Sequence, residues 1–284
     1  MTLIHNISDT ARWAAVYRAR ETERSDALFR DPFARRLAGE RGEEIANAIA
    51  FSNQNTWSWI ARTYLFDHFI TQEIAGGCDL VINLAAGLDA RPYRMHLPPS
   101  LQWIEIDLPG ILDYKEEILR SDKPVCALER IRLDLSDASA RREWFAKLGS
   151  RGSKALIISE GLIVYFTAGE VGALARDLAA PTSFQRWLTD LCSPGLLNLL
   201  KKKMGSEMGD SAVLKFAPPE GPAFFAPYGW KPLEVRSFLK TAGKLKRLPL
   251  FLKIMSLLPE SNAEQGSRPW AAACLMGKEP AEAG

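Results

Sequence analysis

The sequence predicts an α/β fold in which a mostly parallel sheet of about seven strands is covered by helices. From residue 79 onward, short and almost continuously apolar runs alternate with amphipathic stretches of helical spacing. Strands that are apolar on both faces are typical of parallel sheets, and the intervening helices supply the crossover connections. Before this point the spacing is helical throughout, so we expect a helical extension (residues 1–78) packed on a core (residues 79–284).

The N-terminal extension is predicted to contain three helices. Ser8 or Asp9 is a candidate N-cap of the first, because a short polar side chain can accept hydrogen bonds from the free amides of a first helical turn. Gly76 and Gly77 are expected to end the third, since glycine is common directly after a helix. The three predicted helices span residues 8–20, 26–39 and 55–75.

The core is predicted to alternate strands and helices as far as its last strand. Residues 205–228 interrupt this alternation, and their many glycines and prolines predict a long loop within a lid or substrate region at residues 195–230. The expected helices span residues 88–95, 109–121, 136–149, 167–179 and 231–242. The expected strands span residues 80–86, 101–108, 130–135, 155–166, 183–191, 244–250 (a weak one) and 269–277.

The composition argues against several classes of protein. A formal net charge of +2, without an evident basic block, argues against nucleic acid as a partner. The four scattered cysteines form no metal-type pair and indicate a reducing cytoplasm, and the N-terminus has no signal-peptide pattern. No apolar run reaches the roughly 20 residues of a membrane span. Residues 247–259 come nearest, and we interpret them as core strand and helix rather than a membrane attachment.

The stretch DLVINLAAGLDARPYRM, which begins at Asp79, joins a predicted strand to a glycine turn. Ligands of open α/β sheets bind at the carboxyl ends of the strands, and Gly87 would allow the backbone to approach a ligand closely there. Dinucleotide sites need more glycines than this turn has, and triphosphate sites need a lysine that it lacks. A ligand with a ribose but without a phosphate therefore remains compatible.

Acidic side chains occur at or near the next three predicted strand ends. Asp107, about 20 positions after Gly87, is placed to accept hydrogen bonds from ribose hydroxyls, and Asp134 could accept one from an adenine amino group. Glu160 lies inside an apolar run, where a carboxylate requires a partner. Asp107 or Asp134 could instead cap a helix. Three such acids after one glycine turn nevertheless favour a nucleoside-type ligand.

These motifs, in this order, resemble the leucine carboxyl methyltransferase-like family of S-adenosylmethionine-dependent methyltransferases, which includes protein phosphatase methyltransferases and bacterial polyketide O-methyltransferases. The resemblance runs from ARWAAVYRARETERSDALFRDPFARRLAG through WIARTYLFD, VINLAAGLDARPYRM, WIEIDLPGILDYKEEIL and RLDLSD to ISEGLIVYFTAGEV, and it fades after residue 180. It implies a Rossmann-like class I methyltransferase sheet and S-adenosyl-L-methionine as the cofactor.

The resemblance also implies a role for each matching residue. Arg62 would bind the carboxylate of the cofactor's methionine end, and Glu160 would lie near its ammonium group, which agrees with the one cation and one anion that a zwitterion requires. Without the resemblance, a solvated or helix-pairing arginine is the simpler interpretation of Arg62. The other implied contacts are Gly87 with the methionine part, Asp107 with the ribose, and Asp134 and Leu135 with adenine.

The glycine turn departs from the family at two positions. The family typically has Gly-Ala-Gly-Leu-Asp-Thr-Arg, whereas this chain has AAGLDAR, so that Ala85 replaces a glycine and Ala90 replaces a threonine. A methyl group at Ala85 would lie close to the cofactor. Asp89 and Arg91 keep the family pattern, and we expect them to shape the turn and to pair locally.

The acceptor is predicted from the shortage of general bases. His5 lies in the N-terminal tail, His68 on a helix and His96 at a helix end. A carboxylate is ionised at neutral pH and needs no base, so the sequence favours O-methylation of a carboxylate, or of an acidic hydroxyl. The resemblance implies a small organic, polyketide-like molecule as the acceptor. Tyr165 is either a residue of the acceptor pocket or an ordinary core residue. The sequence assigns no catalytic residue and does not predict the oligomeric state. The alternatives are protein C-terminal carboxyl methylation, a nicotinamide dehydrogenase and a cofactor-binding protein without turnover.

Overall fold

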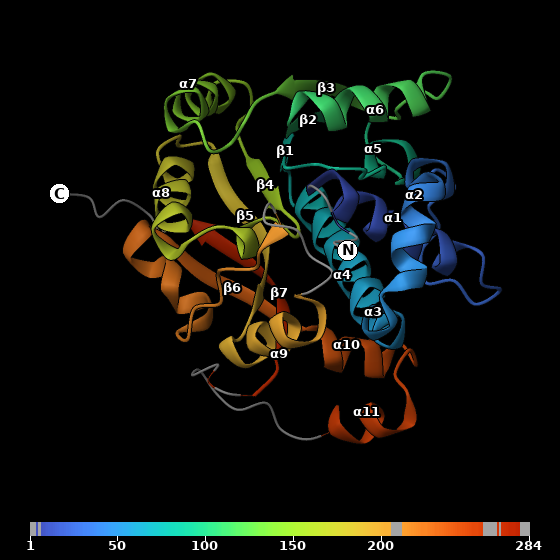
Figure 1. The fold of residues 1–284 in the computed structure, drawn as a ribbon. Helices are drawn as coiled ribbons and strands as arrows, with labels where there is room; N and C mark the ends of the chain where they lie inside the picture. Colours follow the sequence, from blue (N-terminus) through green and yellow to red (C-terminus); the bar gives the residue numbers. More distant parts are fainter. Residues whose placement is uncertain (1–3, 5–6, 206–211, 258–265, 267, 279–284) are drawn as a thin grey trace.

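The computed structural model describes residues 4, 7–205, 212–257, 266 and 268–278, and its central layer is a seven-stranded sheet (Figure 1). The strands are β1 (Leu80–Leu84), β2 (Gln102–Asp107), β3 (Ala127–Arg132), β4 (Ala155–Ser159), β5 (Phe184–Cys192), β6 (Trp230–Ser237) and β7 (Ala271–Lys278). The helices are α1 (Ile7–Thr22), α2 (Ala34–Ala48), α3 (Ala50–Gln54), α4 (Thr56–Ala75), α5 (Arg91–Arg94), α6 (Pro109–Leu119), α7 (Ala138–Gly149), α8 (Ala168–Ala179), α9 (Pro194–Met204), α10 (Phe238–Lys244) and α11 (Leu250–Met255), with 3-10 helices η1 (Ile163–Tyr165) and η3 (Gly221–Tyr228).

The sheet is mostly parallel, which confirms the predicted fold class. Its strand order is β3-β2-β1-β4-β5-β7-β6, and the first five of these strands pair in parallel. β7 returns between β5 and β6 and pairs antiparallel with both. All residues of β1 and β4 are buried. Apart from Asn83 and Ser159, these two strands are apolar instead of alternating between polar and apolar residues.

Helices cover both faces of the sheet, so that alternate residues of one strand belong to different cores. Ile82 of β1 packs in a cluster with Phe145 of α7 and Leu174 of α8. The neighbouring Val81 packs in a second cluster that contains Phe66 of α4. Figure 1 shows α7 and α8 on one side of the strands and α4 on the other. The two-residue period of a strand makes this division possible.

The N-terminal helices pack against the carboxyl edge of the sheet. Tyr17 of α1 belongs to a third cluster, together with Leu88 after β1 and Ile111 after β2. The methyl group of Ala11, also on α1, lies so close to Gly87 that a Cβ at that glycine would approach it to 3.2 Å. α1 therefore faces the strand ends that carry the predicted site residues.

The second predicted helix is wrong at both ends. It begins at Ala34 rather than near residue 26, and it does not stop at Gly39 but continues to Ala48. Gly39 has a φ of +61° and kinks the helical stretch without ending it. Glycine reaches this left-handed conformation at little cost, so it marks a bend here rather than a terminus.

The predicted helix at residues 231–242 is wrong over its first seven residues and is confirmed only at residues 238–242, which belong to α10; the weak strand at residues 244–250 is also wrong. The sixth strand, β6, occupies Trp230–Ser237 and lies at the edge of the sheet. Within the described part of the chain it pairs with β7 alone, and its register is irregular between Pro232 and Glu234. An edge strand tolerates a proline and a bulge because one side of it has no partner, and both features hide the alternation by which a strand is identified.

Two surface segments differ from their predicted form. The run interpreted as core strand and helix is instead α11, which has no buried residue; residues 258 and 259 of that run lie outside the described part. The predicted lid contains most of α9 and all of η3, while residues 206–211 within it also lie outside the described part. Among the helices that the structure describes, none is long and apolar enough to cross a bilayer.

Candidate functional site

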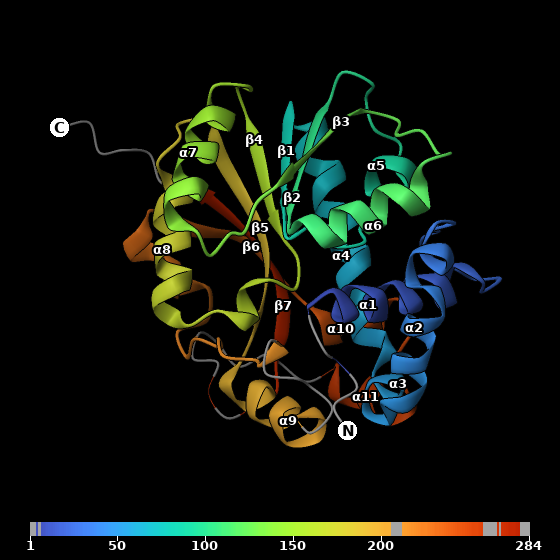
Figure 2. The ribbon, with the colours of Figure 1, turned by 45° about the horizontal axis from the view of Figure 1, so that its top comes forward.

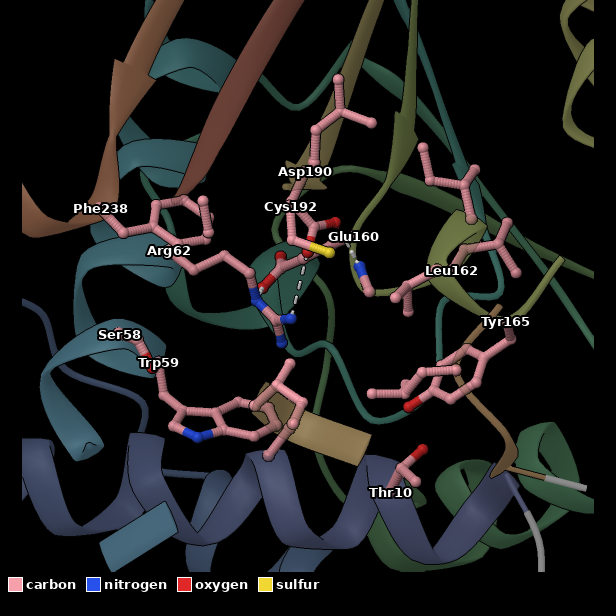
Figure 3. Close-up of a pocket in the computed structure, with 18 of the residues that line it drawn as sticks. Thr10, Ser58, Trp59, Arg62, Glu160, Leu162, Tyr165, Asp190, Cys192 and Phe238 are labelled. Atoms are coloured by element: carbon pink, nitrogen blue, oxygen red, sulfur yellow. Dashed lines mark hydrogen bonds and ion pairs between the residues drawn. The ribbon is translucent and has the colours of Figure 1, made fainter. Parts of the chain in front are cut away.

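A cavity of about 1240 Å³ lies at the carboxyl edge of the sheet, where strand ends face α1, α4 and α9 (Figure 3). Carboxyl ends of parallel strands meet at one edge, so residues that are distant in the sequence become neighbours there. The cavity lining includes all of the predicted site residues, which are Arg62, Gly87, Asp107, Asp134, Leu135, Glu160 and Tyr165.

Asp107, the last residue of β2, holds the glycine turn that follows β1. The amide of Gly87 donates to Asp107 Oδ2 over 2.7 Å, and the amide of Leu108 donates to Oδ1 over 2.7 Å. Burial raises the pKa of this carboxyl, although the two amide hydrogen bonds oppose the shift. Helix α6 begins without a side-chain cap. The capping alternative is therefore wrong for Asp107, which is a buried acceptor facing the turn.

Asp134 and Leu135 follow β3 and occupy the neighbouring part of the lining. The carboxylate of Asp134 accepts a hydrogen bond from the Ser136 amide over 2.8 Å. Helix α7 is capped by Asp137, which accepts hydrogen bonds from two amides of the first turn. Asp134 is therefore not an N-cap either. Its exposed carboxylate stands next to Leu135, whose side chain is buried in the core.

Arg62 of α4 reaches across the cavity to two carboxylates. Its Nε lies 3.0 Å from Glu160 Oε1, and its Nη1 lies 3.4 Å from Asp190 Oδ2 (Figure 3). Burial works against the charged guanidinium, but these two carboxylates outweigh it and raise the pKa of Arg62. The predicted strand at residues 155–166 ends at Ser159. Glu160 therefore lies at a strand end, and it has the charged partner that an acid in an apolar run requires.

A second arginine, Arg91, forms an ion pair with the other carboxylate oxygen of Glu160. Arg91 Nη1 lies 2.9 Å from Glu160 Oε2 and 2.7 Å from Asp89 Oδ2, and Arg91 Nε lies 2.7 Å from Asp67 Oδ1. The local pairing of Asp89 with Arg91 is confirmed. Burial opposes ionisation of Asp89, yet the positive charges of Arg91 and Lys115 lower its pKa well below the ordinary value. These pairs fix the orientation of Glu160 toward the cavity.

Asp190 is the functional candidate that the sequence analysis missed. Its Oδ1 accepts a hydrogen bond from the Gly161 amide over 2.7 Å while Oδ2 faces Arg62. Burial raises its pKa. A signal was present, because Asp190 lies near the end of the fifth strand and continues the series of acids at strand ends. Cys192 also lines the cavity, and burial raises the pKa of its thiol to about 12, so it remains protonated near neutral pH.

Tyr165 lies in η1 on the side of the cavity that faces α1. Its hydroxyl points toward Thr10 (Figure 3), and burial raises the pKa of the phenol. The ring also packs against the hydrophobic cluster of α1 and α2. Tyr165 is thus both a wall of the cavity and a packing residue, with a protonated hydroxyl that can donate a hydrogen bond.

Ala85 adopts a backbone conformation that L-residues with a Cβ rarely take. Its φ is +49°, and the family's glycine at this position would reach the same region without a Cβ clash. Its methyl group packs against the core cluster of the sheet. The backbone of the turn is therefore strained at Ala85. The sequence predicted only that the methyl group of Ala85 would lie close to the cofactor.

Replacing Ala85 with glycine is expected to raise the free energy of unfolding by about 0.5–1 kcal/mol. Removing the Cβ from a left-handed residue stabilises the folded state by about 1–2 kcal/mol. Glycine also gives the unfolded chain more conformational entropy, which offsets about half of that gain. Urea unfolding measures the change. Ala86→Gly is the matched control, because Ala86 is buried without a positive φ and should lose stability. Equal losses in both variants would contradict strain at Ala85.

Among the described residues, no group of three His, Cys, Asp or Glu side chains is arranged to hold a metal ion. Comparison with known proteins gives a family match over residues 11–179, to the leucine carboxyl methyltransferase model. A relative from Streptomyces coelicolor, provisionally named an S-adenosyl-L-methionine-dependent methyltransferase, is 31% identical over 78% of this chain and 82% of its own length. One from Mycobacterium sp. (strain KMS), with the same provisional name, is 28% identical over 84% of this chain and 88% of its own length.

The solved structures support the fold alone. A provisionally assigned methyltransferase from Thermobifida fusca superposes with a TM-score of 0.61 at 15% identity, covering 98% of this chain and 96% of that one. A DUF574 family protein from Streptomyces avermitilis has a TM-score of 0.60 at 10% identity, covering 94% and 97%. The match of the family model over more than half of the sequence shows that this chain belongs to the leucine carboxyl methyltransferase family.

Proposed function

We propose that this protein is an S-adenosyl-L-methionine-dependent O-methyltransferase that acts on a carboxylate, or on an acidic hydroxyl, of a small organic and polyketide-like acceptor. One observation carries the proposal. A glycine turn held by Asp107 opens into the same cavity as the Arg62–Glu160 pair. A ribose and a zwitterionic tail are the two polar parts of this cofactor, and both find complementary groups there.

The residues of the cavity fit the cofactor by their chemistry. Arg62 and Glu160 neutralise each other in the structure, so the carboxylate and the ammonium group of the methionine end can replace that internal pair with two equivalent ones. Asp107 keeps unused lone pairs on both oxygens for the ribose hydroxyls. The remaining assignments are Gly87 beside the methionine part, and Asp134 with Leu135 around adenine.

The cavity has room for an acceptor beside the cofactor. Its volume exceeds the roughly 300–1,000 Å³ typical of a single small-molecule site. The lining beyond the polar groups is aromatic and aliphatic, with Trp57, Trp59, Phe216, Phe238 and Trp270 among its members. An apolar organic molecule is therefore favoured as the acceptor over a polar metabolite. We propose that it enters at the lid region, residues 195–230. This region belongs to the methyltransferase core of residues 79–284, on which the helical extension of residues 1–78 packs.

The side chains favour a carboxylate as the methylated group. The cofactor, when bound, supplies the methyl group as an electrophilic sulfonium. No histidine is found among the described residues that line the cavity, and the Cys192 thiol and Tyr165 phenol are held protonated. A carboxylate is ionised without a base, and the Tyr165 hydroxyl could orient it by donating a hydrogen bond. Alignment and exclusion of water are then the main tasks of the protein. The four free cysteines support a cytoplasmic location.

Binding and turnover tests separate this function from its alternatives. We expect S-adenosylhomocysteine to raise the melting temperature, because a ligand selective for the folded state stabilises it, and NADH to have no effect. Methyl transfer should be found with apolar carboxylic acids in a panel that also contains phenols and peptides ending in leucine. Transfer only to the peptides would favour protein C-terminal methylation. Cofactor binding with no transfer to any member would favour a binding protein, and stabilisation by NADH alone a dehydrogenase.

A further inference from the structure

The short helix α11 exposes a group of apolar side chains to solvent. Leu250, Phe251 and Ile254 of α11 are 78%, 73% and 61% exposed, and Leu257, two residues after the helix, is 81% exposed. Single apolar residues are ordinary on protein surfaces, but a group of them on one element marks an interaction site. The apolar run of this segment predicted a buried strand and helix, so its exposure is a finding of the structure.

The exposed helix borders the cavity. Phe251, Leu252 and Met255 belong to the cavity lining. Because Phe251 is both largely exposed and part of that lining, the cavity reaches the surface beside α11. Leu199 and Leu200 of α9 also line the cavity. Figures 1 and 2 show α9 and α11 at the same end of the molecule.

Positive charge is concentrated on α9 and on the segment that runs from α10 to the end of α11 and the two residues after it. Residues 238–257 contain five basic side chains and no acid, and residues 194–204 of α9 contain Lys201, Lys202 and Lys203 and no acid. The whole chain has a net charge of only +2, so the remainder of the sequence is net acidic. Among these basic residues only Arg247 forms ion pairs within the described part, with Glu21 and Asp26. Within the described part, the lysines of both segments therefore have no acidic partner. The small net charge of the whole chain does not reveal this local excess of basic residues, because acidic residues elsewhere balance it.

Exposed apolar side chains and lysines at one end of the molecule match the chemistry of an anionic lipid surface. Such a helix lies in the plane of the interface, buries its apolar residues among the headgroups and acyl chains, and places its lysines near the phosphates. A second copy of this chain would bring the same lysines face to face, which like charges disfavour. The phosphates of a nucleic acid could pair with these lysines, but binding them would leave the four exposed aliphatic and aromatic side chains unburied.

We infer that the face formed by α11 and by Lys201, Lys202, Lys203, Lys244 and Lys253 docks on anionic phospholipid membranes. Docking would place the open side of the cavity against the bilayer. The protein would then take up a lipophilic acceptor directly from the membrane, a consequence that rests on the proposed function, whereas the docking itself does not. This revises the expectation that the protein has no membrane partner. The proposed contact is with the membrane surface and involves no membrane-spanning segment.

Vesicle flotation of the full-length protein tests the docking. We expect binding to vesicles of phosphatidylcholine mixed with phosphatidylserine, little binding to phosphatidylcholine alone, and release by salt, since a Debye length of about 8 Å at physiological ionic strength shrinks to about 3 Å at 1 M. The double variant Leu250→Ser/Ile254→Ser should bind at least about tenfold less. Neither residue lines the cavity. Val125→Ser, at an exposed residue of the β2–β3 connection, is the matched control and should bind normally.

Three further outcomes decide the inference. The triple change Lys201→Gln, Lys202→Gln and Lys203→Gln should lose most of the salt-sensitive binding. Binding that is equal on both vesicle types, or unchanged in the two multiple variants, would overturn the docking site. So would a dimer in light scattering that the double variant dissociates, with no vesicle binding. S-adenosylhomocysteine stabilisation is measured in parallel: vesicle binding without it would leave the docking intact and reject the proposed function, and the reverse result would reject the docking alone.

Discussion

Replacing Asp107 with alanine is expected to lower the affinity for S-adenosylhomocysteine at least about 100-fold and to leave the protein folded. A hydrogen bond to a charged acceptor contributes about 1.5–3 kcal/mol, and two ribose hydroxyls would lose such a bond; roughly 2.7 kcal/mol corresponds to 100-fold. The change also frees the Gly87 amide, which loosens the turn against which the methionine part would lie. Isothermal titration calorimetry gives the affinity, and circular dichroism gives the fold.

A surface aspartate provides the control for this substitution. Asp113 lies on α6 and is 61% exposed in its pair with Arg132. Asp113→Ala should bind the ligand like the unchanged protein. If Asp107→Ala also retained full affinity while remaining folded, the assignment of this carboxylate to the ribose would be refuted, and the glycine turn would have only a structural purpose.

Replacing Arg62 with methionine should abolish cofactor binding and also destabilise the protein by about 3 kcal/mol at neutral pH. Removing one member of a partly buried ion pair leaves its partner as an uncompensated charge. Glu160 would retain Arg91, but Asp190 would lose Arg62, its only ion-pair partner among the described residues. Arg142→Met, at an exposed arginine on α7, is the control and should change neither property.

The loss of stability in Arg62→Met should depend on pH. Burial already raises the pKa of Asp190 in the presence of Arg62, and removal of the guanidinium raises it further. A carboxyl whose folded-state pKa exceeds its unfolded value destabilises the fold above that unfolded value, and the penalty disappears as the pH falls and the group protonates. The variant should therefore approach the stability of the unchanged protein at acidic pH. Urea unfolding at two pH values measures this.

A double variant separates binding from stability at this position. Asp190→Asn removes the stranded charge and keeps an acceptor for the Gly161 amide. Arg62→Met/Asp190→Asn should thus recover most of the lost stability at neutral pH but none of the affinity. If the double variant were as unstable as the single one, packing of the arginine stem, and not charge, would account for the loss.

Several features of the site could be predicted from the sequence because they follow strand ends. A buried parallel strand is continuously apolar, so its last residue is visible in the sequence, and parallel strands all end at one edge. Gly87 and Asp107 were found in this way, whereas Glu160 was identified as an acid inside an apolar run, because its strand was predicted to continue to residue 166. Asp190 follows the same rule and could have been found by extending it to the fifth strand. β6 escaped the rule, because an edge strand with a proline loses its alternation.

The sequence by itself determined the order of strands and helices from β1 to β5, the family, and the acids and glycine that meet in the cavity, because each depends on local periodicity or on the position of a residue relative to a strand end. Only the tertiary structure decided the pairing of Arg62 with Glu160 and Asp190, the strain at Ala85 and the exposure of α11. An ion pair between distant elements, a backbone dihedral angle and the solvation of an apolar run all depend on which parts of the chain pack together, and no local pattern encodes that.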